Sequence, residues 1–182
     1  WWSFVAVFCG LLLSLSGAYL YLSPSLPSVE SLRTVRLQMP LKVFSSDNKL
    51  IAEFGEMRRA PIKFADIPQD FINALLAAED DNFANHHGVD FKSLMRAGSE
   101  LIKSGHIQTG GSTITMQVAK NFFLSSERSF SRKINEILLA LQIERELSKD
   151  EILELYVNKI YLGNRAYGIE AAAQVYYGKS IS

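Results

Sequence analysis

The longest apolar stretch of the chain lies at its start. Residues 1–22 contain no charged side chain and consist mainly of aliphatic and aromatic residues. About 20 apolar residues cross a bilayer as a helix, and aromatic residues favour both membrane interfaces. A cleaved signal peptide has a shorter apolar core, followed by a small-residue cleavage site. We therefore expect residues 1–22 to form one transmembrane anchor.

After this stretch the pattern changes to short runs separated by turn residues. Residues 23–60 begin with serines and prolines, and two runs typical of strands follow at Leu41–Ser45 and Leu50–Phe54. We expect this segment to be a linker that contains a β-hairpin. Because no basic cluster follows the apolar stretch, the pattern favours an outside location for the rest of the chain.

From Pro68 onward, apolar positions recur with helical spacing. The first predicted helix starts at Pro68, has Asp66 as its cap and ends at Glu79. Ser148 and Glu151 have the spacing of a capping box at the start of a later helix. The remaining predicted helices span residues 91–103, with Asp90 as cap, and residues 113–120, 131–147, 148–162 and 169–176. Residues 61–182 are therefore predicted to be one mainly α domain.

The helix predicted over residues 131–147 is apolar nearly all round. At 100° per residue, one side gathers Ile134, Ile137, Leu138 and Leu141, and the polar patch opposite is flanked by Leu139, Ala140 and Ile143. Such a helix is buried, so Glu136 in that patch is not expected on a wet surface. A buried carboxylate needs a partner or a task. A structural ion pair with Arg132 or Lys133 and a role in a functional site both stay open.

Glu79 ends its predicted helix and begins the acidic run Glu79-Asp80-Asp81. The carbonyl end of a helix disfavours a carboxylate, and that bias suits a general base. The simpler interpretation of this stretch alone is a solvated acidic helix end.

A glycine-rich turn, Gly110-Gly111-Ser112-Thr113, precedes another predicted helix. Such a turn can bind an anion through free backbone amides, although it is also a good helix start. Lys120 and the pair Arg132-Lys133 would add positive charge for a phosphate group. With a membrane anchor and two separated carboxylates, these features favour a lipid-phosphate substrate.

Composition narrows the remaining classes. The chain has 182 residues with 19 basic and 19 acidic side chains, which fits one domain plus an appendage and gives no case for a nucleic-acid partner. Cys9 is the only cysteine, so there is no disulfide framework. The three histidines lack the spacing of a zinc site, and no metal ligands are predicted.

Five motifs in order resemble a known family. Residues 79–88 match the signature Glu-Asp-x-x-Phe-x-x-His-x-Gly of peptidoglycan glycosyltransferases, glycosyltransferase family 51. The family's second to fifth motifs resemble, in order, residues 110–117, 132–136, 149–158 and 165–172. Met116 stands where the family usually has a glutamine. The resemblance covers about residues 35–182 and looks like the N-terminal part of a class A penicillin-binding protein. Since the family's domain continues beyond Ser182, we expect its last helices and any transpeptidase domain to be absent from this chain.

The resemblance implies a lysozyme-like domain on the outer (periplasmic) face of the bacterial cytoplasmic membrane. Its reaction would polymerise lipid II into β-1,4-linked glycan strands, with inversion and release of undecaprenyl pyrophosphate. Glu79 would be the base that takes the acceptor's 4-hydroxyl proton, and Glu136 would act on the donor side. Residues that match pyrophosphate-binding groups are Lys120, Arg132 and Lys133, and those that match groups shaping the cleft are Asp80, Phe83, His86, Ser112, Thr113, Gln117 and Arg165.

The resemblance also bears on cofactors, partners and alternatives. Some relatives use Mg²⁺ or another divalent cation, and the sequence offers no complete site for one. Expected partners are lipid II, the growing glycan strand, membrane lipid and other cell-wall synthesis proteins. A lysozyme-like lytic hydrolase and a membrane-anchored cell-wall scaffold stay open. For inverting transfer we predict that Glu79 and Glu136 face one cleft without touching, since paired carboxylates of inverting hydrolases stand about 6.5–9.5 Å apart.

Overall fold

The computed structural model describes residues 1–3, 5–10, 13, 17, 26–34, 40–55, 58–104, 110–124 and 130–181. Much of the predicted anchor, residues 1–22, lies outside this set. None of the helices that can be examined in the described ranges has the length and apolarity needed to cross a bilayer. His106 and Gly105 also lie outside the described residues.

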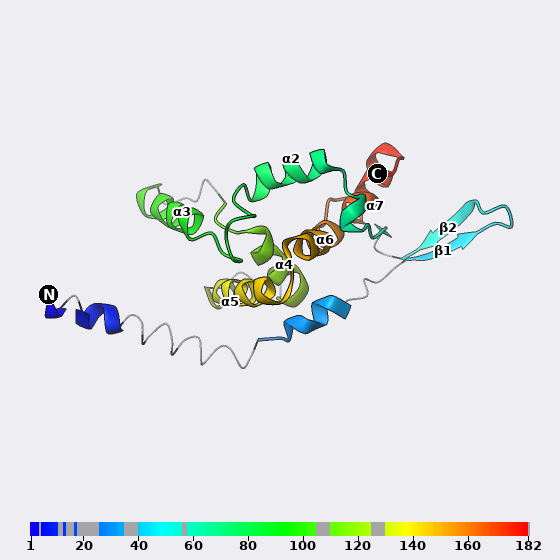
Figure 1. Ribbon diagram of the computed structural model, residues 1–182. Helices are drawn as coiled ribbons and strands as arrows, with labels where there is room; N and C mark the ends of the chain where they lie inside the picture. The colour runs from blue at the N-terminus through cyan, green and yellow to red at the C-terminus, as the bar shows by residue number, and fades with distance from the viewer. Residues whose placement is uncertain are drawn as a thin grey trace.

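The described part of the chain is mainly helical, as predicted (Figure 1). Its α-helices are α2 (Gln69–Glu79), α3 (Phe91–Ser104), α4 (Ile114–Phe123), α5 (Phe130–Glu146), α6 (Lys149–Lys159) and α7 (Ile169–Tyr177). The described residues also contain two short 3-10 helices, η2 (Val29–Thr34) and η3 (Phe64–Asp66), and four short strands, β1 (Leu41–Phe44), β2 (Leu50–Phe54), β3 (Arg58–Arg59) and β4 (Ala166–Tyr167).

The boundaries of α2 and α6 depart slightly from the sequence prediction. Asp66 is not the cap of α2, because it lies in η3 and Pro68 occupies the cap position without a side-chain hydrogen bond. The capping box of Ser148 and Glu151 at α6 is confirmed. This helix ends at Lys159 rather than near residue 162, because Ile160 has an extended backbone with φ −58° and ψ 135°.

Helix α4 is the centre of the molecule and packs between α5 and α6 (Figure 1). Five of its residues are buried, since it is covered on several sides. The cluster that these three helices share includes Ile114, Val118, Leu139, Ile143, Ile152, Tyr156 and Val157. This packing matters for function, because α4, α5 and α6 each carry predicted site residues or motif residues.

The burial of α5 resolves the question raised by its sequence. Leu139, Ala140 and Ile143 are fully buried, whereas Ile134 on the opposite side is 44% exposed. Glu136 shares the buried side and is only 4% exposed. The prediction that Glu136 is off the wet surface is confirmed, and the polar patch turns out to lie on the best-packed side of the helix.

The segment before α2 is more than a connection. The predicted hairpin is confirmed, because β1 and β2 pair antiparallel, and it projects away from the helices (Figure 1). Val29 and Leu32 of η2 are buried in the main core. Strand β3 pairs in parallel with β4, which ties this segment to the far end of the chain.

Candidate active site

The loop after α2 is built around a buried carboxylate–imidazole pair. Asp80 and His86 are 8% and 7% exposed, and Nε2 of His86 lies 3.0 Å from Oδ2 of Asp80. The backbone amide of Gly88 donates to Nδ1 of His86 at 3.1 Å. Because Nδ1 accepts, we assign the ring proton to Nε2, which donates it to Asp80. The pair therefore closes the loop on itself.

Asp80 also holds the start of α4. The amide of Ile114, the first residue of α4, donates to Oδ2 of Asp80 at 2.9 Å. A carboxylate is stabilised at the N-terminus of a helix by the free amides and the helix dipole. The amide of Met116 is taken by the side chain of Thr113, the N-cap. Two amides at this helix start, where the sequence suggested a phosphate site, are thus bonded within the chain, one to Asp80 and one to Thr113.

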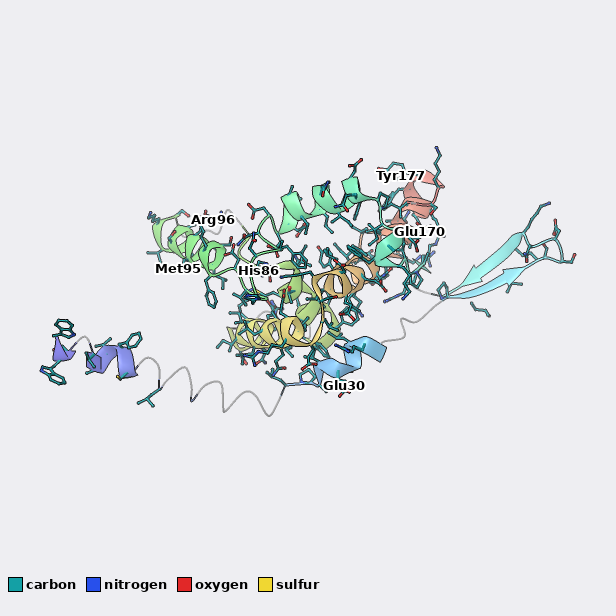
Figure 2. All side chains as sticks on the ribbon, viewed as in Figure 1. Glu30, His86, Met95, Arg96, Glu170 and Tyr177 are labelled. Atoms are coloured by element: carbon teal, nitrogen blue, oxygen red, sulfur yellow. The ribbon has the colours of Figure 1, made fainter. Side chains whose placement is uncertain are left out.

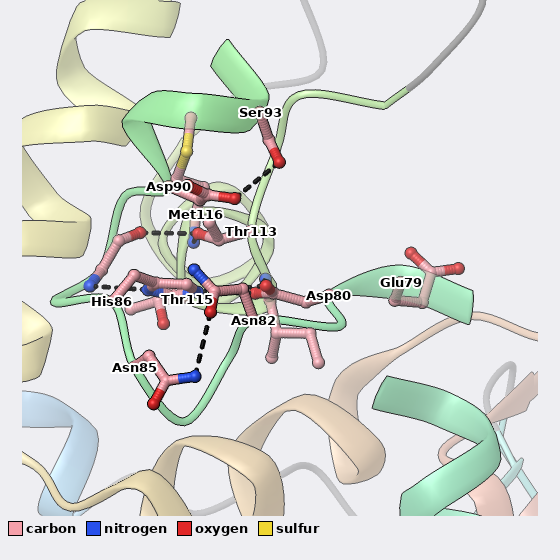
Figure 3. Close-up of polar contacts among 12 residues, drawn as sticks. Glu79, Asp80, Asn82, Asn85, His86, Asp90, Ser93, Thr113, Thr115 and Met116 are labelled. Carbon is pink, nitrogen blue, oxygen red and sulfur yellow. Dashed lines mark hydrogen bonds and ion pairs between the residues drawn. The ribbon is translucent and has the colours of Figure 1, made fainter. Parts of the chain in front are cut away.

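Gly88 lets the same loop approach α5. Its φ is +90°, and a Cβ there would lie 2.5 Å from the carbonyl oxygen of Ala140, so a side chain does not fit. The Thr113 hydroxyl donates to the Gly88 carbonyl at 2.6 Å. Figure 3 shows these contacts, with Glu79 pointing away from the buried group of polar side chains.

Lys149 holds the loop after α2 in place. Its ammonium donates to the His86 carbonyl at 2.8 Å and to Glu144 at 2.7 Å, and it lies 4.3 Å from the centre of the Phe83 ring. Thr115 donates to the same Glu144 carboxylate at 2.7 Å. Lys149 and Glu144 were not predicted as parts of the site, although Lys149 begins the fourth motif.

A cleft of about 400 Å³ lies beside this loop. Five of the predicted site residues line it, namely Glu79, Asp80, Ser112, Thr113 and Gln117. The other side is closed by Asp90, which precedes α3, and by Ser93 and Arg96 of α3. The first two motifs of the sequence therefore meet in one concave site.

Glu79 is an exposed carboxylate of this cleft, as is Asp81. It is the last residue of α2, and Nε2 of Gln117 donates to its Oε2 at 2.9 Å. Oε1 of Gln117 in turn accepts from the Tyr156 hydroxyl at 3.4 Å. Tyr156 is almost fully buried, and burial, with the nearby negative charge of Glu79, raises the pKa of Tyr156 to about 12. The tyrosine therefore keeps its proton at neutral pH.

Glu136 lies between two cations. Its Oε2 accepts from Lys133 at 2.9 Å, and its Oε1 lies 3.1 Å from Nε of Arg132, a charge contact without hydrogen-bond alignment. Lys133 also donates to the Ser112 hydroxyl at 2.6 Å. Ser112 lines the cleft and Glu136 does not, so this cluster lies behind the wall that carries Glu79. The prediction that both glutamates face one cleft is therefore wrong for Glu136, because Arg132 and Lys133 hold its carboxylate in a buried position.

Other predicted site residues lie apart from this wall. Lys120 is half-buried on α4, and Arg165 is exposed in a turn with φ +61°. Phe83 is 2% exposed and makes an edge contact with the His86 ring at 5.9 Å between centroids. None of these three side chains, nor that of His86, lines the 400 Å³ cleft.

Asp90 titrates away from its ordinary range. The hydroxyl of Ser93 donates to its Oδ2 at 2.6 Å and the amide of Lys92 to its Oδ1 at 3.1 Å, as expected of a cap for α3. The hydrogen bond from Ser93 is the main cause that holds the pKa of Asp90 below 3.8. Asp90 is thus an ionised part of the cleft wall at neutral pH.

The described ranges contain no set of side chains that could bind a divalent cation. No group of three or more histidine, cysteine or acidic side chains that could hold a metal ion occurs there. Two acids of the cleft are already engaged, because Asp80 accepts from Ile114 and Asp90 from Ser93. With Asp80 and Asp90 engaged, the described residues of the cleft do not form a ligand set for Mg²⁺.

Comparison with known proteins decides the family. A family model described as "Transglycosylase" matches residues 47–182. The chain belongs to the transglycosylase family. The resemblance to peptidoglycan glycosyltransferases and penicillin-binding proteins, based on five motifs, is therefore confirmed.

Several relatives agree with this assignment. Penicillin-binding protein 1A of Pseudomonas aeruginosa is 83% identical over 181 residues, which is 100% of this chain and 22% of that protein. Penicillin-binding protein 1A of Escherichia coli is 54% identical over 168 residues, covering 92% of this chain and 20% of the relative. The chain thus spans about a fifth of the length of the curated relatives it matches.

A solved structure also matches, with a weak overall superposition. The crystal structure of penicillin-binding protein 1A from Haemophilus influenzae covers 81% of this chain and 12% of that chain at 32% identity. Its TM-score is 0.33, which is too low to bear on the fold.

Proposed function

We propose that this chain polymerises lipid II into β-1,4-linked glycan strands, as the lysozyme-like glycosyltransferase domain of a longer cell-wall enzyme. The observation that carries the proposal is an exposed carboxylate, Glu79, on the wall of a 400 Å³ cleft that Lys133 reaches through Ser112. Family membership over residues 47–182 supports the same chemistry. The substrates are then lipid II and the growing strand.

The proposed step is a single displacement. Glu79 takes the proton from the 4-hydroxyl of the acceptor sugar, and that oxygen forms a bond to the anomeric carbon of the lipid-linked strand. The bond from that carbon to the pyrophosphate oxygen breaks, and undecaprenyl pyrophosphate leaves with the electron pair. Attack opposite to the leaving group converts an α to a β linkage. A base in position contributes about 10²- to 10⁴-fold to such a step.

The cations near Glu136 suit the leaving group. Negative charge gathers on the pyrophosphate as the bond breaks, and fixed positive groups lower that barrier. Arg132 and Lys133 are held by Glu136, and Lys133 reaches the cleft wall at Ser112. A guanidinium binds phosphate through parallel contacts, whereas an ammonium acts as a point charge. In this proposal Glu136 acts on the donor side by keeping both cations in place, and Lys120 adds a third.

The remaining predicted site residues have two kinds of proposed role. Gln117 and Ser112 line the cleft and would contact the sugars. Thr113 also borders the cleft, but its hydroxyl is bonded to Gly88 and Met116, so it would act by shaping the loop. Asp80, Phe83 and His86 are buried and would act by shaping the loop. Arg165 is proposed to reach substrate from the fifth motif.

Location at a membrane is part of the proposal. Phe91, Met95 and Ile102 of α3 are 67%, 77% and 88% exposed, and they lie within about 40° of one another around the helix. The exposed Lys92 and Lys103 both lie along one edge of this apolar stripe. Figure 2 shows Met95 projecting from α3, the helix that closes the cleft. A helix of this kind lies well on an anionic lipid surface.

We propose the following organisation: a single-pass anchor at residues 1–22, a linker with the β-hairpin at 23–60, and the glycosyltransferase domain at 61–182, on the periplasmic side of the bacterial inner membrane. The apolar composition of residues 1–22 supports the anchor. Membrane lipid and other cell-wall synthesis proteins are the proposed partners besides the substrates.

The test offers two substrates separately to the complete protein. With lipid II we expect long glycan strands and free undecaprenyl pyrophosphate, and with finished glycan we expect no fragments. Fragments from finished glycan without polymerisation would identify a lytic hydrolase instead. Turnover of neither substrate, with binding of other cell-wall proteins, would identify a scaffold.

A further inference from the structure

A buried tyrosine stands behind the proposed base. Tyr156 of α6 is 1% exposed and its ring belongs to the main core, so it cannot touch a substrate in the cleft. Its hydroxyl lies 3.4 Å from Oε1 of Gln117, and Nε2 of Gln117 lies 2.9 Å from Oε2 of Glu79. The three residues come from α6, α4 and α2 and form one line of hydrogen bonds from the core to the cleft.

The orientation of the Gln117 amide is the point at issue. A side-chain amide has a donor end and an acceptor end of nearly the same shape, so a half-turn exchanges them. While Glu79 is ionised, the carboxylate itself requires the donor end. Once Glu79 has taken a proton, however, it can donate, and the flipped amide with its oxygen toward Glu79 becomes favourable as well.

Resting on the proposed function, we propose that Tyr156 is a positioning residue that keeps the amide of Gln117 in its donor orientation in both protonation states of Glu79. The Tyr156 hydroxyl donates to Oε1. If the amide turned, the hydroxyl oxygen could accept from Nε2, but the hydroxyl proton would be buried without an acceptor, which costs free energy. Only Gln117 is recorded as a partner of that hydroxyl among the described residues. The amide therefore keeps facing Glu79 with N–H, and the base is ready for the next sugar once its proton leaves.

The protonation state of Tyr156 fits this role. Burial and the charge of Glu79 raise the pKa of Tyr156 to about 12, so the hydroxyl remains a donor at every physiological pH. The 3.4 Å separation is longer than the usual 2.7–2.8 Å for an O–H donor, so the proposed role requires this contact to shorten when substrate binds. A hydroxyl with no role of this kind would be poorly placed in an apolar core.

The experiment measures lipid II consumption by the complete protein at several lipid II concentrations. For Tyr156→Phe we expect kcat to fall about five- to tenfold, the size expected for one hydrogen bond, with KM changed less than twofold. In a Gln117→Ala background the same substitution should change kcat no further, because the residue through which Tyr156 acts is gone. The matched control is Tyr176→Phe, which removes a hydroxyl that donates to the Leu162 carbonyl at 2.9 Å, away from the cleft.

The outcomes separate this proposal from the proposed function. If the wild-type protein polymerises lipid II but Tyr156→Phe retains wild-type kcat, the positioning role is wrong and the function stands. An equal loss in both backgrounds, or an equal loss in Tyr176→Phe, would also overturn the role, because the effect would then be general weakening of the fold. If wild-type protein does not polymerise lipid II, the function itself fails.

Discussion

Two glutamates of this protein occupy opposite environments. Glu79 is exposed at the end of α2 and accepts from a neutral amide, that of Gln117. Glu136 is 4% exposed inside α5 and lies between Arg132 and Lys133. A carboxylate that exchanges protons with substrate needs access and few fixed charges around it. A carboxylate that holds cations needs burial and close contact, so the two environments suit the two proposed roles.

The comparison predicts its largest effect on activity for Glu79→Gln. Removing the base should lower polymerisation by about 10²- to 10⁴-fold, since an amide cannot take the proton. The melting temperature should hardly change, because the side chain is exposed and a glutamine still accepts from Gln117. The measurement is the initial rate of strand formation together with thermal unfolding.

Asp70→Asn is the matched control, because Asp70 is an exposed acid in the first turn of the same helix. It should polymerise at the wild-type rate. Wild-type polymerisation by Glu79→Gln would remove Glu79 from the chemistry, and the contrast between the two glutamates would lose its meaning.

The second prediction concerns Glu136→Gln, where stability should respond. The side chains of Arg132 and Lys133 are 19% and 37% exposed, so losing the shared negative charge leaves two poorly hydrated cations. A fully buried pair costs about 3–5 kcal/mol to break, and with this exposure we expect about 1–3 kcal/mol. Displaced cations should also slow the reaction about 10- to 100-fold. Thermal unfolding and rate are measured on the same samples.

Glu146→Gln is the control here, since Glu146 is an exposed acid at the end of the same helix. It should leave both quantities unchanged. An unchanged melting temperature in Glu136→Gln would mean that the cations do not depend on Glu136, and the two glutamates would then differ in exposure alone.

The environment of Glu136 could be predicted from the sequence better than that of Glu79. Local rules predicted the helices, the capping box at Ser148 and the burial of Glu136, because helical spacing and caps depend on residues within a few positions. The contacts that shape the cleft join distant positions: Asp80 reaches Ile114 across 34 residues, and Lys149 reaches His86 across 63. No periodicity carries that information, so these contacts could not be predicted.

Tyr156 illustrates a signal that was available and not used. It follows Ile152 and Leu153 at helical spacing on the buried side of α6, where its ring packs as an ordinary core residue. An aromatic side chain with a hydroxyl at such a position needs a polar partner. The sequence could therefore have indicated a buried acceptor near Tyr156, but not that the acceptor is Gln117.

The smallest effect on stability is expected for a third carboxylate, that of Asp90. It lines the cleft like Glu79, and its hydrogen bonds come from the first turn of α3. Asp90 has a pKa below its ordinary value of 3.8, chiefly because Ser93 donates to it. A depressed pKa in the folded state adds stability above the ordinary pKa, and that stability is lost as the pH falls through the folded-state value. Asp90→Asn should therefore be less stable than wild type at pH 7 by about 0.5 kcal/mol, or roughly 2 °C.

The pH dependence distinguishes this effect from a simple change of shape. The gap in melting temperature between wild type and Asp90→Asn should be constant from pH 7 to 5 and shrink as the pH falls below 3.8, where the aspartate in the unfolded chain becomes protonated. Ser93→Ala removes the main hydrogen bond to Asp90 and keeps the carboxylate. Its melting temperature at pH 7 should therefore exceed that of Asp90→Asn by less than the wild type does. A gap in melting temperature that persists unchanged at low pH would show that the charge of Asp90 does not stabilise α3. The carboxylates of this cleft would then differ in their surroundings and not in the effect of their charge.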